Sequence, residues 1–197
     1  MSYESIVLAS ASERRSLLLA QIGVRHRSVA ADLDEQLLPD EHPDDYVRRL
    51  ARSKALAVAG ALGGWPDRPV LAADTTVVLD GRIYGKPADE QDCVDILMAL
   101  SGRSHEVLTA IALQDDGTLC TAMNSSRVTF RALAAPECRR YWASGEPAGK
   151  AGAYAIQGLG AVFIAKLEGS FSGVMGLPLF ETAALLDAAG VRRWQNP

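Results

Sequence analysis

Four short polar segments of the chain carry the side chains best suited to chemistry. They are Ser10-Ala11-Ser12-Glu13-Arg14-Arg15, Ala73-Asp74-Thr75, Gly85-Lys86-Pro87 and the loop of residues 145–158. Four of the fourteen loop residues are glycine, so its backbone can approach a ligand where a Cβ atom would block it. Its Gln157 offers an amide donor and a carbonyl acceptor, the pair needed to read the edge of a nucleobase. Glycine-rich loops are more often plain turns, so this loop gains meaning only beside the other three segments.

The segment from Ser10 to Arg15 lies where a predicted strand leads into a predicted helix. Such a junction presents free backbone N–H groups and the positive end of the helix dipole, which together bind anions. Ser10 and Ser12 add hydroxyl donors, and Arg14 and Arg15 can grip phosphate with bidentate guanidinium groups. The plainer reading is a helix cap followed by solvated arginines.

Carboxylates and lysines in other segments extend this set. Asp74 ends an apolar run, where a carboxylate needs a partner, so it is either a site residue or an aspartate that caps backbone N–H groups. Thr75 adds a donor beside it. By default, Lys54 in a predicted helix and Lys86 beyond a predicted hairpin would be solvated. The acidic segment Asp32-Leu33-Asp34-Glu35 could supply a second carboxylate, and paired carboxylates bind hard cations such as Mg²⁺.

Several common site types are absent from the sequence. His26, His42 and His105 have no metal-ligand spacing, and no Ser-His-Asp or Cys-His nucleophilic pattern appears. The chain has neither a Walker loop nor a G-x-G-x-x-G motif, which removes the commoner nucleotide-handling classes. Its three cysteines are widely spaced and form no disulfide or zinc pattern, so a reducing compartment is expected.

The composition is that of an ordinary globular protein. The 197 residues suffice for one large domain or two closely packed lobes. A net charge of −4 and a pI of about 5.4 argue against a nucleic-acid or anionic-membrane surface, although they leave nucleotide binding open. No signal-like segment or membrane-length apolar run is visible, so we expect a cytoplasmic protein without membrane or nucleic-acid partners.

Predicted strands and helices alternate along the chain, and hairpins separate some of the strands. Residue patterns predict strands at 5–9, 25–29, 70–79, 82–84, 106–113, 126–133 and 161–167, and helices at 12–22, 44–62, 90–100, 136–143 and 179–189. Asp80-Gly81 between two β-branched runs is a strong hairpin signal. This order favours a mixed α/β sheet over a fully parallel one.

Taken in order, these segments resemble the Maf family of nucleoside triphosphate pyrophosphatases over nearly the whole chain. The resemblance rests on Leu8-Ala9-Ser10-Ala11-Ser12-Glu13-Arg14-Arg15, Asp34-Glu35, Ala73-Asp74-Thr75, Gly85-Lys86-Pro87, Leu100-Ser101-Gly102-Arg103-Ser104-His105, Lys150-Ala151-Gly152-Ala153-Tyr154-Ala155-Ile156-Gln157-Gly158 and Gly176-Leu177-Pro178-Leu179. Each motif is modest alone, but six or more in the right order are very specific.

The resemblance implies an enzyme that hydrolyses a nucleoside triphosphate between its α and β phosphates, giving a monophosphate and pyrophosphate with the help of Mg²⁺ or Mn²⁺. In this comparison Asp74 corresponds to the catalytic carboxylate and Glu35 shares the metal with it. The remaining roles fall to cations, hydroxyls and one amide. Lys54 and Lys86 would neutralise phosphate charge in the transition state, Ser10, Ser12, Arg14, Arg15 and Lys150 would bind the substrate, and Thr75 and Gln157 match positions that choose the base.

The Lys-Ala-Gly-Ala-Tyr-x-Ile-Gln run resembles the family branch that acts on dTTP and UTP, and differs from the branch that acts on 7-methyl-GTP. It therefore implies pyrimidine triphosphates, modified ones included, in a housecleaning role in nucleotide metabolism. The implied fold is α/β and Maf/ITPase-like, with a central mixed sheet flanked by helices. A single domain of residues 1–197 would form two lobes around an active-site cleft, and homodimers are common in the family.

Two residues depart from the family pattern. Glu13 stands where proline is usual, and Gly149 stands where aspartate usually precedes the loop lysine. Both bear on rate and metal affinity more than on fold. One alternative reading is a different base preference, for which Gln157 is the discriminating residue. Another is a nucleotide-binding interaction module with little or no turnover. A nucleic-acid binder is a weaker reading, because the chain has no basic stripe and no aromatic platform.

Overall fold

The computed structural model describes residues 3–63 and 68–195 of the chain. Its strands are β1 (Ile6–Leu8), β2 (His26–Ser28), β3 (Val70–Leu79), β4 (Arg82–Tyr84), β5 (Ser104–Asp115), β6 (Thr118–Phe130) and β7 (Ile164–Glu168). The α-helices are α1 (Glu13–Gln21), α2 (Pro43–Ala61), α3 (Glu90–Leu100), α4 (Ala135–Ala143), α5 (Phe171–Met175) and α6 (Leu179–Ala188), and two 3₁₀ helices are η1 (Ala151–Ala153) and η2 (Leu159–Phe163).

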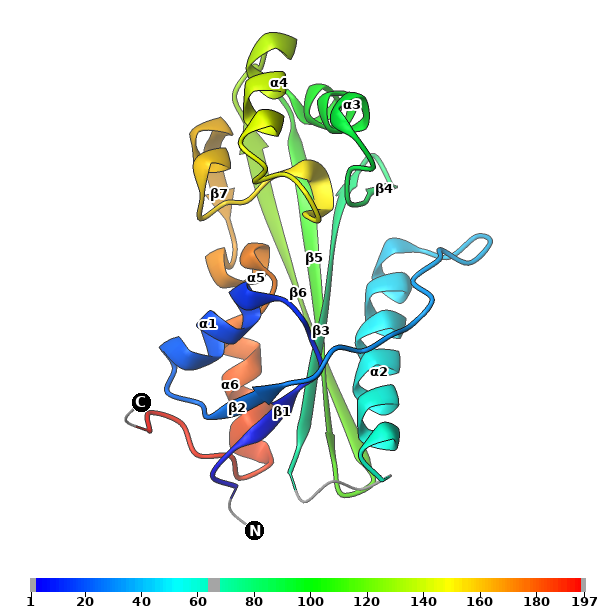
Figure 1. Ribbon diagram of the computed structural model, residues 1–197, viewed down its shortest axis with the longest axis vertical. Coiled ribbons are helices and arrows are strands. Elements are labelled where there is room, and N and C mark those ends of the chain that lie inside the picture. Colours follow the sequence, from blue (N-terminus) through cyan, green and yellow to red (C-terminus); the bar gives the residue numbers. More distant parts are fainter. Residues whose placement is uncertain (1–2, 64–67, 196–197) are drawn as a thin grey trace.

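All of these strands form one mixed sheet. Their order is β2-β1-β3-β5-β6-β7, and β4 pairs with β3 as a side branch. β1 runs parallel to β2 and β3, whereas the pairs β3–β4, β3–β5, β5–β6 and β6–β7 are antiparallel. The expected mixed α/β sheet flanked by helices is therefore confirmed (Figure 1).

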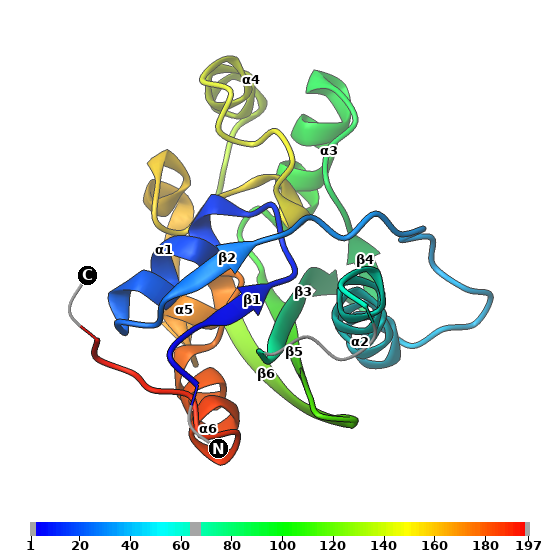
Figure 2. The same cartoon turned by 60° about the horizontal axis from the view of Figure 1, so that its bottom comes forward.

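Helices cover both faces of the sheet at one end and cap it at the other. α2 lies against one face, while α1 and α6 lie on the opposite side, as Figure 2 shows from below. Side chains alternate between these two cores along β5: Ala110 and Ala112 pack with α2, and Ile111 and Leu113 pack with α6. At the far end, α3 and α4 cover the sheet over a third core.

The sequence explains α2, which carries one of the site lysines. Pro43 occupies the first turn, where a missing N–H costs nothing, and Asp44 and Asp45 complement the helix dipole. Val47, Leu50, Ala51, Lys54, Ala55 and Val58 recur at helical spacing and are all buried. Lys54 therefore lies on the apolar face of α2 rather than on its solvated face.

A tight hairpin joins β3 to β4. Asp80 and Gly81 both have positive φ, 51° and 75°, as a two-residue turn matched to the twist of the strands requires. β4 then leads directly to Gly85-Lys86-Pro87. The hairpin thus brings the second lysine segment back beside β3.

Three elements differ from those predicted. β6 begins at Thr118 rather than at residue 126, because its polar first half is held in the sheet by β5 and carries no apolar alternation of its own. Residues 161–163 belong to η2, so β7 starts only at Ile164. The five-residue helix α5 was not predicted, since it is too short to show a period. Among the described residues, no helix combines the length and hydropathy that crossing a membrane demands.

Candidate active site

β3 has one fully paired edge and one partly open edge. β5 pairs with residues 70–78 of β3 on one side. On the other side, the described strands pair with β3 only at its two ends, β1 at Val70–Leu71 and β4 at Val77–Leu79. A cleft of about 860 Å³ lies along the intervening segment. The apolar run before Asp74 suggested that this residue ends a strand, but it lies in the middle of β3. It lines the cleft at the part of β3 where the edge is open.

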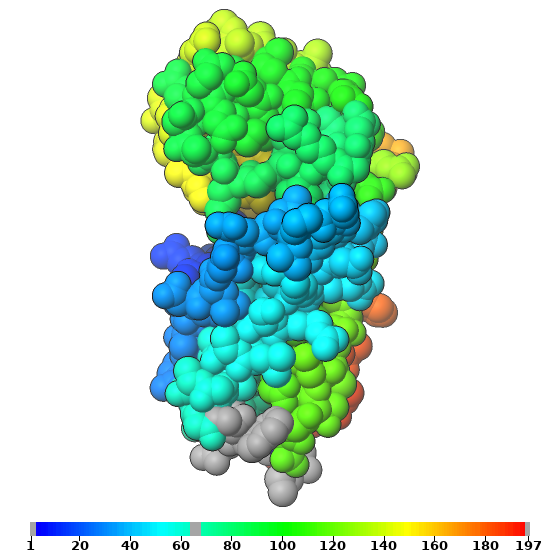
Figure 3. All heavy atoms as spheres, turned by 90° about the vertical axis from the view of Figure 1, so that its right-hand side faces the viewer, coloured from blue at the N-terminus to red at the C-terminus, as the bar shows by residue number. Residues whose placement is uncertain are grey.

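The cleft collects every site residue that the sequence indicated. Its lining includes Ser10, Ser12, Arg14, Arg15, Glu35, Lys54, Asp74, Thr75, Lys86, Lys150 and Gln157. These residues come from segments separated by more than a hundred positions in the chain. The space-filling view in Figure 3 shows the molecule narrowing between the green upper part, around α3, and the blue and cyan lower part.

Alternating carboxylates and ammonium groups form a continuous chain in the cleft. Lys54 Nζ lies 2.6 Å from Asp74 Oδ1 and 2.6 Å from Glu35 Oε1. The second oxygen of Glu35 lies 3.3 Å from Lys86 Nζ. Lys54 is only 8% exposed, so the default reading of a solvated lysine is wrong for it, whereas Lys86 is exposed. Asp74 pairs with Lys54, and within the described residues its carboxylate accepts from no backbone N–H group.

Burial and charge act in opposite directions on the two carboxylates. Burial raises the pKa of Asp74 above its ordinary value, although the cations of Lys54 and Arg15 oppose the rise. Burial alone would also raise the pKa of Glu35, but the hydrogen bond and charge of Lys54, assisted by Lys86, bring that pKa below its usual range. Two neighbouring carboxylates with divergent pKa values are typical of a site with divided acid–base roles.

The segment from Ser10 to Arg15, which leads into the first turn of α1, forms a cationic wall of the cleft. Arg15 donates through Nε to the carbonyl of Gly176 at 2.8 Å, and Arg14 donates through Nε to the carbonyl of Met175 at 3.3 Å. Both arginines are partly buried, and burial lowers the pKa of each guanidinium group. They are thus held by α5 rather than solvated. Ser12 precedes α1, but its side chain makes no cap hydrogen bond.

A chain of hydroxyl groups links this wall to the centre of the sheet. Arg15 reaches Ser10 Oγ at 3.1 Å and Thr75 Oγ1 at 3.3 Å. Thr75 Oγ1 lies 2.9 Å from the hydroxyl of Thr109, which donates to the carbonyl of Gly173 at 2.8 Å. Thr109 is fully buried on β5. Because Thr109 uses its proton on the carbonyl, Thr75 donates to Thr109 and its oxygen accepts from Arg15.

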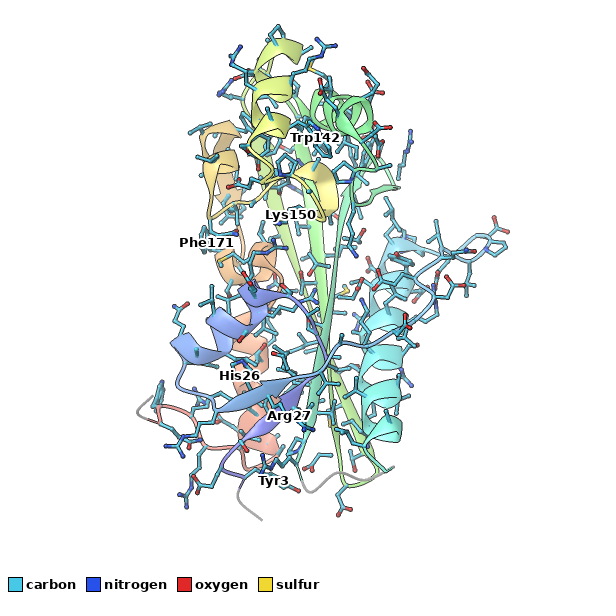
Figure 4. The ribbon with its side chains drawn as sticks, viewed as in Figure 1. Tyr3, His26, Arg27, Trp142, Lys150 and Phe171 are labelled. Atoms are coloured by element: carbon cyan, nitrogen blue, oxygen red, sulfur yellow. The ribbon has the colours of Figure 1, made fainter. Side chains whose placement is uncertain are left out.

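The glycine-rich loop forms the opposite wall. Gly152 donates its N–H to the carbonyl of Gly85 at 3.0 Å, which joins the loop to the Lys86 segment. Lys150 lies on the loop below α4 in Figure 4, and its Nζ donates to the carbonyl of Ala148 at 3.1 Å. Gln157 is exposed, and its amide makes no hydrogen bond within the described residues. That amide is free to meet a ligand.

The two departures from the family pattern both face the cleft. Glu13 is exposed at the start of α1, and Gly149 precedes Lys150. Gly149 has φ of +69°, and an added Cβ atom would find no heavy atom within 4 Å. The position therefore has room for a side chain, at the cost of a left-handed backbone that aspartate tolerates better than most residues.

The donor set partly fits a divalent cation. Oxygens of Glu35 and Asp74 already converge on one cation, the ammonium of Lys54. No group of three histidine, cysteine, aspartate or glutamate side chains could hold a metal within the described ranges. The protein thus offers two carboxylates, which suits Mg²⁺ or Mn²⁺ bound mainly through phosphate oxygens and water.

Two supporting side chains were not identified from the sequence. Tyr46 donates its hydroxyl to the carbonyl of Glu35 at 3.0 Å and so fixes that segment over the cleft. From the sequence, Tyr46 reads only as part of the predicted helix of residues 44–62. Thr109 reads only as part of a strand. In both cases the partner is distant in the chain, so no local signal could have revealed the role.

Comparison with known proteins gives a consistent result. The family model described as Maf-like protein matches residues 5–189. A dTTP/UTP pyrophosphatase of Saccharophagus degradans is 48% identical over 97% of this chain and 91% of its own length. A dTTP/UTP pyrophosphatase of Cupriavidus metallidurans is 50% identical over 94% of this chain and 97% of its own length. One of Bordetella parapertussis is 52% identical over 94% of this chain and 93% of its own length. Among solved structures, the Ham1 protein of Staphylococcus aureus aligns with a TM-score of 0.41 and 16% identity, over 64% of this chain and 71% of that one.

Proposed function

The chain belongs to the Maf family, and we propose that it hydrolyses dTTP and UTP between the α and β phosphates to the nucleoside monophosphate and pyrophosphate. The observation that carries this proposal is the cleft itself. It combines the carboxylates of Glu35 and Asp74 with the cationic side chains of Arg14, Arg15, Lys54, Lys86 and Lys150. Such a site is complementary to a triphosphate and to the negative charge that develops as one phosphate leaves.

We assign the role of general base to Asp74. In this role the carboxylate takes a proton from water, the water oxygen forms a bond to phosphorus, and the bond to the bridging oxygen breaks to release pyrophosphate. A pKa raised by burial brings the carboxylate closer to working pH, which favours proton transfer. Lys54 holds the carboxylate at 2.6 Å and supplies positive charge beside the reacting phosphate.

The other cations would hold the triphosphate. Arg14 and Arg15 are fixed by backbone carbonyls, so their remaining N–H groups are oriented before substrate arrives. We assign Ser10 and Ser12 to binding of the triphosphate as well. Lys86 and Lys150 would neutralise the phosphates from the opposite wall.

Glu35 and Asp74 would hold a divalent cation, Mg²⁺ or Mn²⁺. When bound, the cation would neutralise phosphate oxygens and polarise the phosphorus–oxygen bonds. Glu35 is suited to this task because its pKa lies below the ordinary range, so the carboxylate stays charged. The contact with Tyr46 keeps the Glu35 segment over the cleft.

Thr75 and Gln157 would read the base. Gln157 is exposed and has no hydrogen-bond partner in the part of the chain that the structure describes, as a residue that meets a ligand should be. If its amide reads the ring, Gln157→Glu should change the preference among UTP, CTP and GTP, because a carboxylate can only accept hydrogen bonds.

The decisive experiment is pyrophosphate release from dTTP, UTP, CTP, GTP and 7-methyl-GTP with Mg²⁺ or Mn²⁺, beside Asp74→Asn. Turnover of dTTP and UTP that is lost in the variant supports the proposal. Nucleotide binding without turnover of any substrate by the folded wild-type protein would favour the interaction module instead. The homodimer stays a prediction, which light scattering after size exclusion would test.

A further inference from the structure

A carboxylate and a phenol lie beneath the loop that carries Gln157. Glu146 Oε1 accepts from the hydroxyl of Tyr141 at 2.6 Å and from the N–H of Gly160 at 2.9 Å, and its Oε2 accepts from the N–H of Leu159 at 2.8 Å. The hydroxyl of Tyr141 in turn accepts from the N–H of Ala155 at 3.2 Å. Three backbone amides of the segment 155–160 are therefore fixed by these two side chains.

The glycines of this segment leave room for that arrangement. A Cβ atom at Gly158 would collide with the carboxylate of Glu146. A Cβ atom at Gly160 would lie 2.6 Å from the hydroxyl of Tyr141. Both glycines are therefore needed for close approach to this pair of acceptors, of which Tyr141 is buried and Glu146 is partly buried. Tyr141 is 6% exposed on α4, so the pair connects the loop to a rigid helix.

Gln157 lies midway between the fixed amides. Ala155 precedes it by two residues and Leu159 follows it by two. Its own side chain has no protein partner among the described residues, so its position depends on the backbone that carries it. We propose that Glu146 and Tyr141 are positioning residues that place the amide of Gln157 and thereby set the choice of base. This inference rests on the proposed function of the cleft.

Alternatively, Glu146 could affect substrate binding through the cationic wall of the cleft, by way of Arg14. Arg14 lies close enough to the carboxylate of Glu146 that this charge opposes the lowering of the Arg14 pKa by burial. If Glu146 acted by way of Arg14, its loss would weaken binding of any polyphosphate, with or without a base. Inorganic tripolyphosphate lacks a base and so separates the two routes.

The test uses two substitutions. Glu146→Gln keeps the shape but has only one acceptor oxygen, so an NH₂ group must oppose at least one of the three donors. Tyr141→Phe removes the shared hydroxyl. Glu137→Gln is the matched control: Glu137 lies on α4, like Tyr141, and accepts from Arg131 and from the N–H of Ala134, but no described hydrogen bond joins it to the segment 155–160.

We expect Glu146→Gln to lower kcat/KM for dTTP by about threefold to tenfold, the effect of losing roughly one net hydrogen bond. The ratio of kcat/KM for dTTP over CTP should fall by a similar factor, and Tyr141→Phe should change it in the same direction. Tripolyphosphate affinity, measured calorimetrically in an Asp74→Asn background, should stay within about twofold. Glu137→Gln should leave the ratio unchanged.

An unchanged dTTP/CTP ratio in both variants, or an equal loss of dTTP and tripolyphosphate affinity, would overturn the inference. Wild-type turnover tests the proposed function separately. If the wild-type protein released no pyrophosphate, the relative affinities for dTTP, CTP and tripolyphosphate in the same variants would still decide whether Glu146 positions the base-reading segment.

Discussion

The ammonium of Lys54 lies 2.6 Å from the carboxylate of Asp74, and both side chains are only 10% exposed. The two residues come from different elements, α2 and β3. Their pairing offsets the desolvation of each charge, so removing one partner leaves an uncompensated buried charge. The ion pair therefore links the stability of the fold to the catalytic role proposed for the cleft.

Lys54→Met should lower the free energy of unfolding by about 3 kcal/mol, because Asp74 and Glu35 lose their shared cation. Urea denaturation measures the change. Adding Asp74→Asn should restore part of the loss, since it removes the unpaired charge. Lys166→Met is the control: its pair with Glu168 is mostly exposed, so the change should stay under about 1 kcal/mol. Equal effects of the two lysine substitutions would contradict a buried pair.

Lys86→Met should separate binding from stability. The side chain of Lys86 is 61% exposed and lies 3.3 Å from Glu35, so its loss should change unfolding by less than about 1 kcal/mol. Loss of its charge from the cleft should raise KM for dTTP by about fivefold to tenfold at low salt, and by less at high salt. Steady-state kinetics at two ionic strengths measures this. A KM equal to that of wild type at low salt would remove Lys86 from the substrate site.

His105 should make the protein less stable in acid. Burial lowers the pKa of this imidazole from 6.5 to about 4, and its Nε2 lies 2.9 Å from the hydroxyl of Tyr154. Between these pH values the unfolded chain binds a proton that the folded protein does not. The free energy of unfolding therefore falls as pH decreases from 6.5 to 4, by about 3 kcal/mol in total, and this contribution is constant above that window.

His105→Gln removes the titrating group but keeps a hydrogen-bonding side chain. Denaturation curves at several pH values should show a shallower loss of stability in the variant between pH 6.5 and 4. Other groups titrate in both proteins, so the difference between them isolates the imidazole. Parallel pH profiles would show that His105 is not held neutral by burial.

Two glycines in the same loop should respond differently to alanine. Gly149 and Gly152 both have φ of +69°. At Gly149 an added Cβ meets open space, so Gly149→Ala should cost about 1 kcal/mol from backbone strain alone. At Gly152 the Cβ would lie 2.6 Å from Cγ2 of Val77, so Gly152→Ala should cost on the order of 3 kcal/mol. Denaturation midpoints compare them, and equal costs would refute the close packing against Val77.

Much of the fold follows from local patterns in the sequence. The predicted bounds of β3, β4 and α3 match the structure, because apolar alternation, Asp80-Gly81 and helical spacing are all encoded locally. The predicted starts of β6 and β7 were wrong. Exposed residues from Thr118 onward form a strand only because β5 lies beside them, and that neighbour is invisible in a local window.

The site shows the same division. Charged residues in short motifs were found because their types and order are distinctive, and the structure brings them into one cleft. Glu146, Tyr141 and Thr109 were not assigned roles. Their partners lie in other elements, such as Gly160 for Glu146 and Gly173 for Thr109, so only the folded chain reveals what they hold.

The open edge of β3 adds a ligand-recognition element that side-chain substitution cannot remove. Along an antiparallel strand, every second residue directs its N–H and C=O away from the paired neighbour. Between the contacts of β3 with β1 and β4, such peptide groups face the cleft rather than another described strand. A ligand that satisfies them would be recognised by the main chain, which substitution by alanine leaves in place. The affinity losses from an alanine scan of the cleft should therefore account for only part of the total binding free energy.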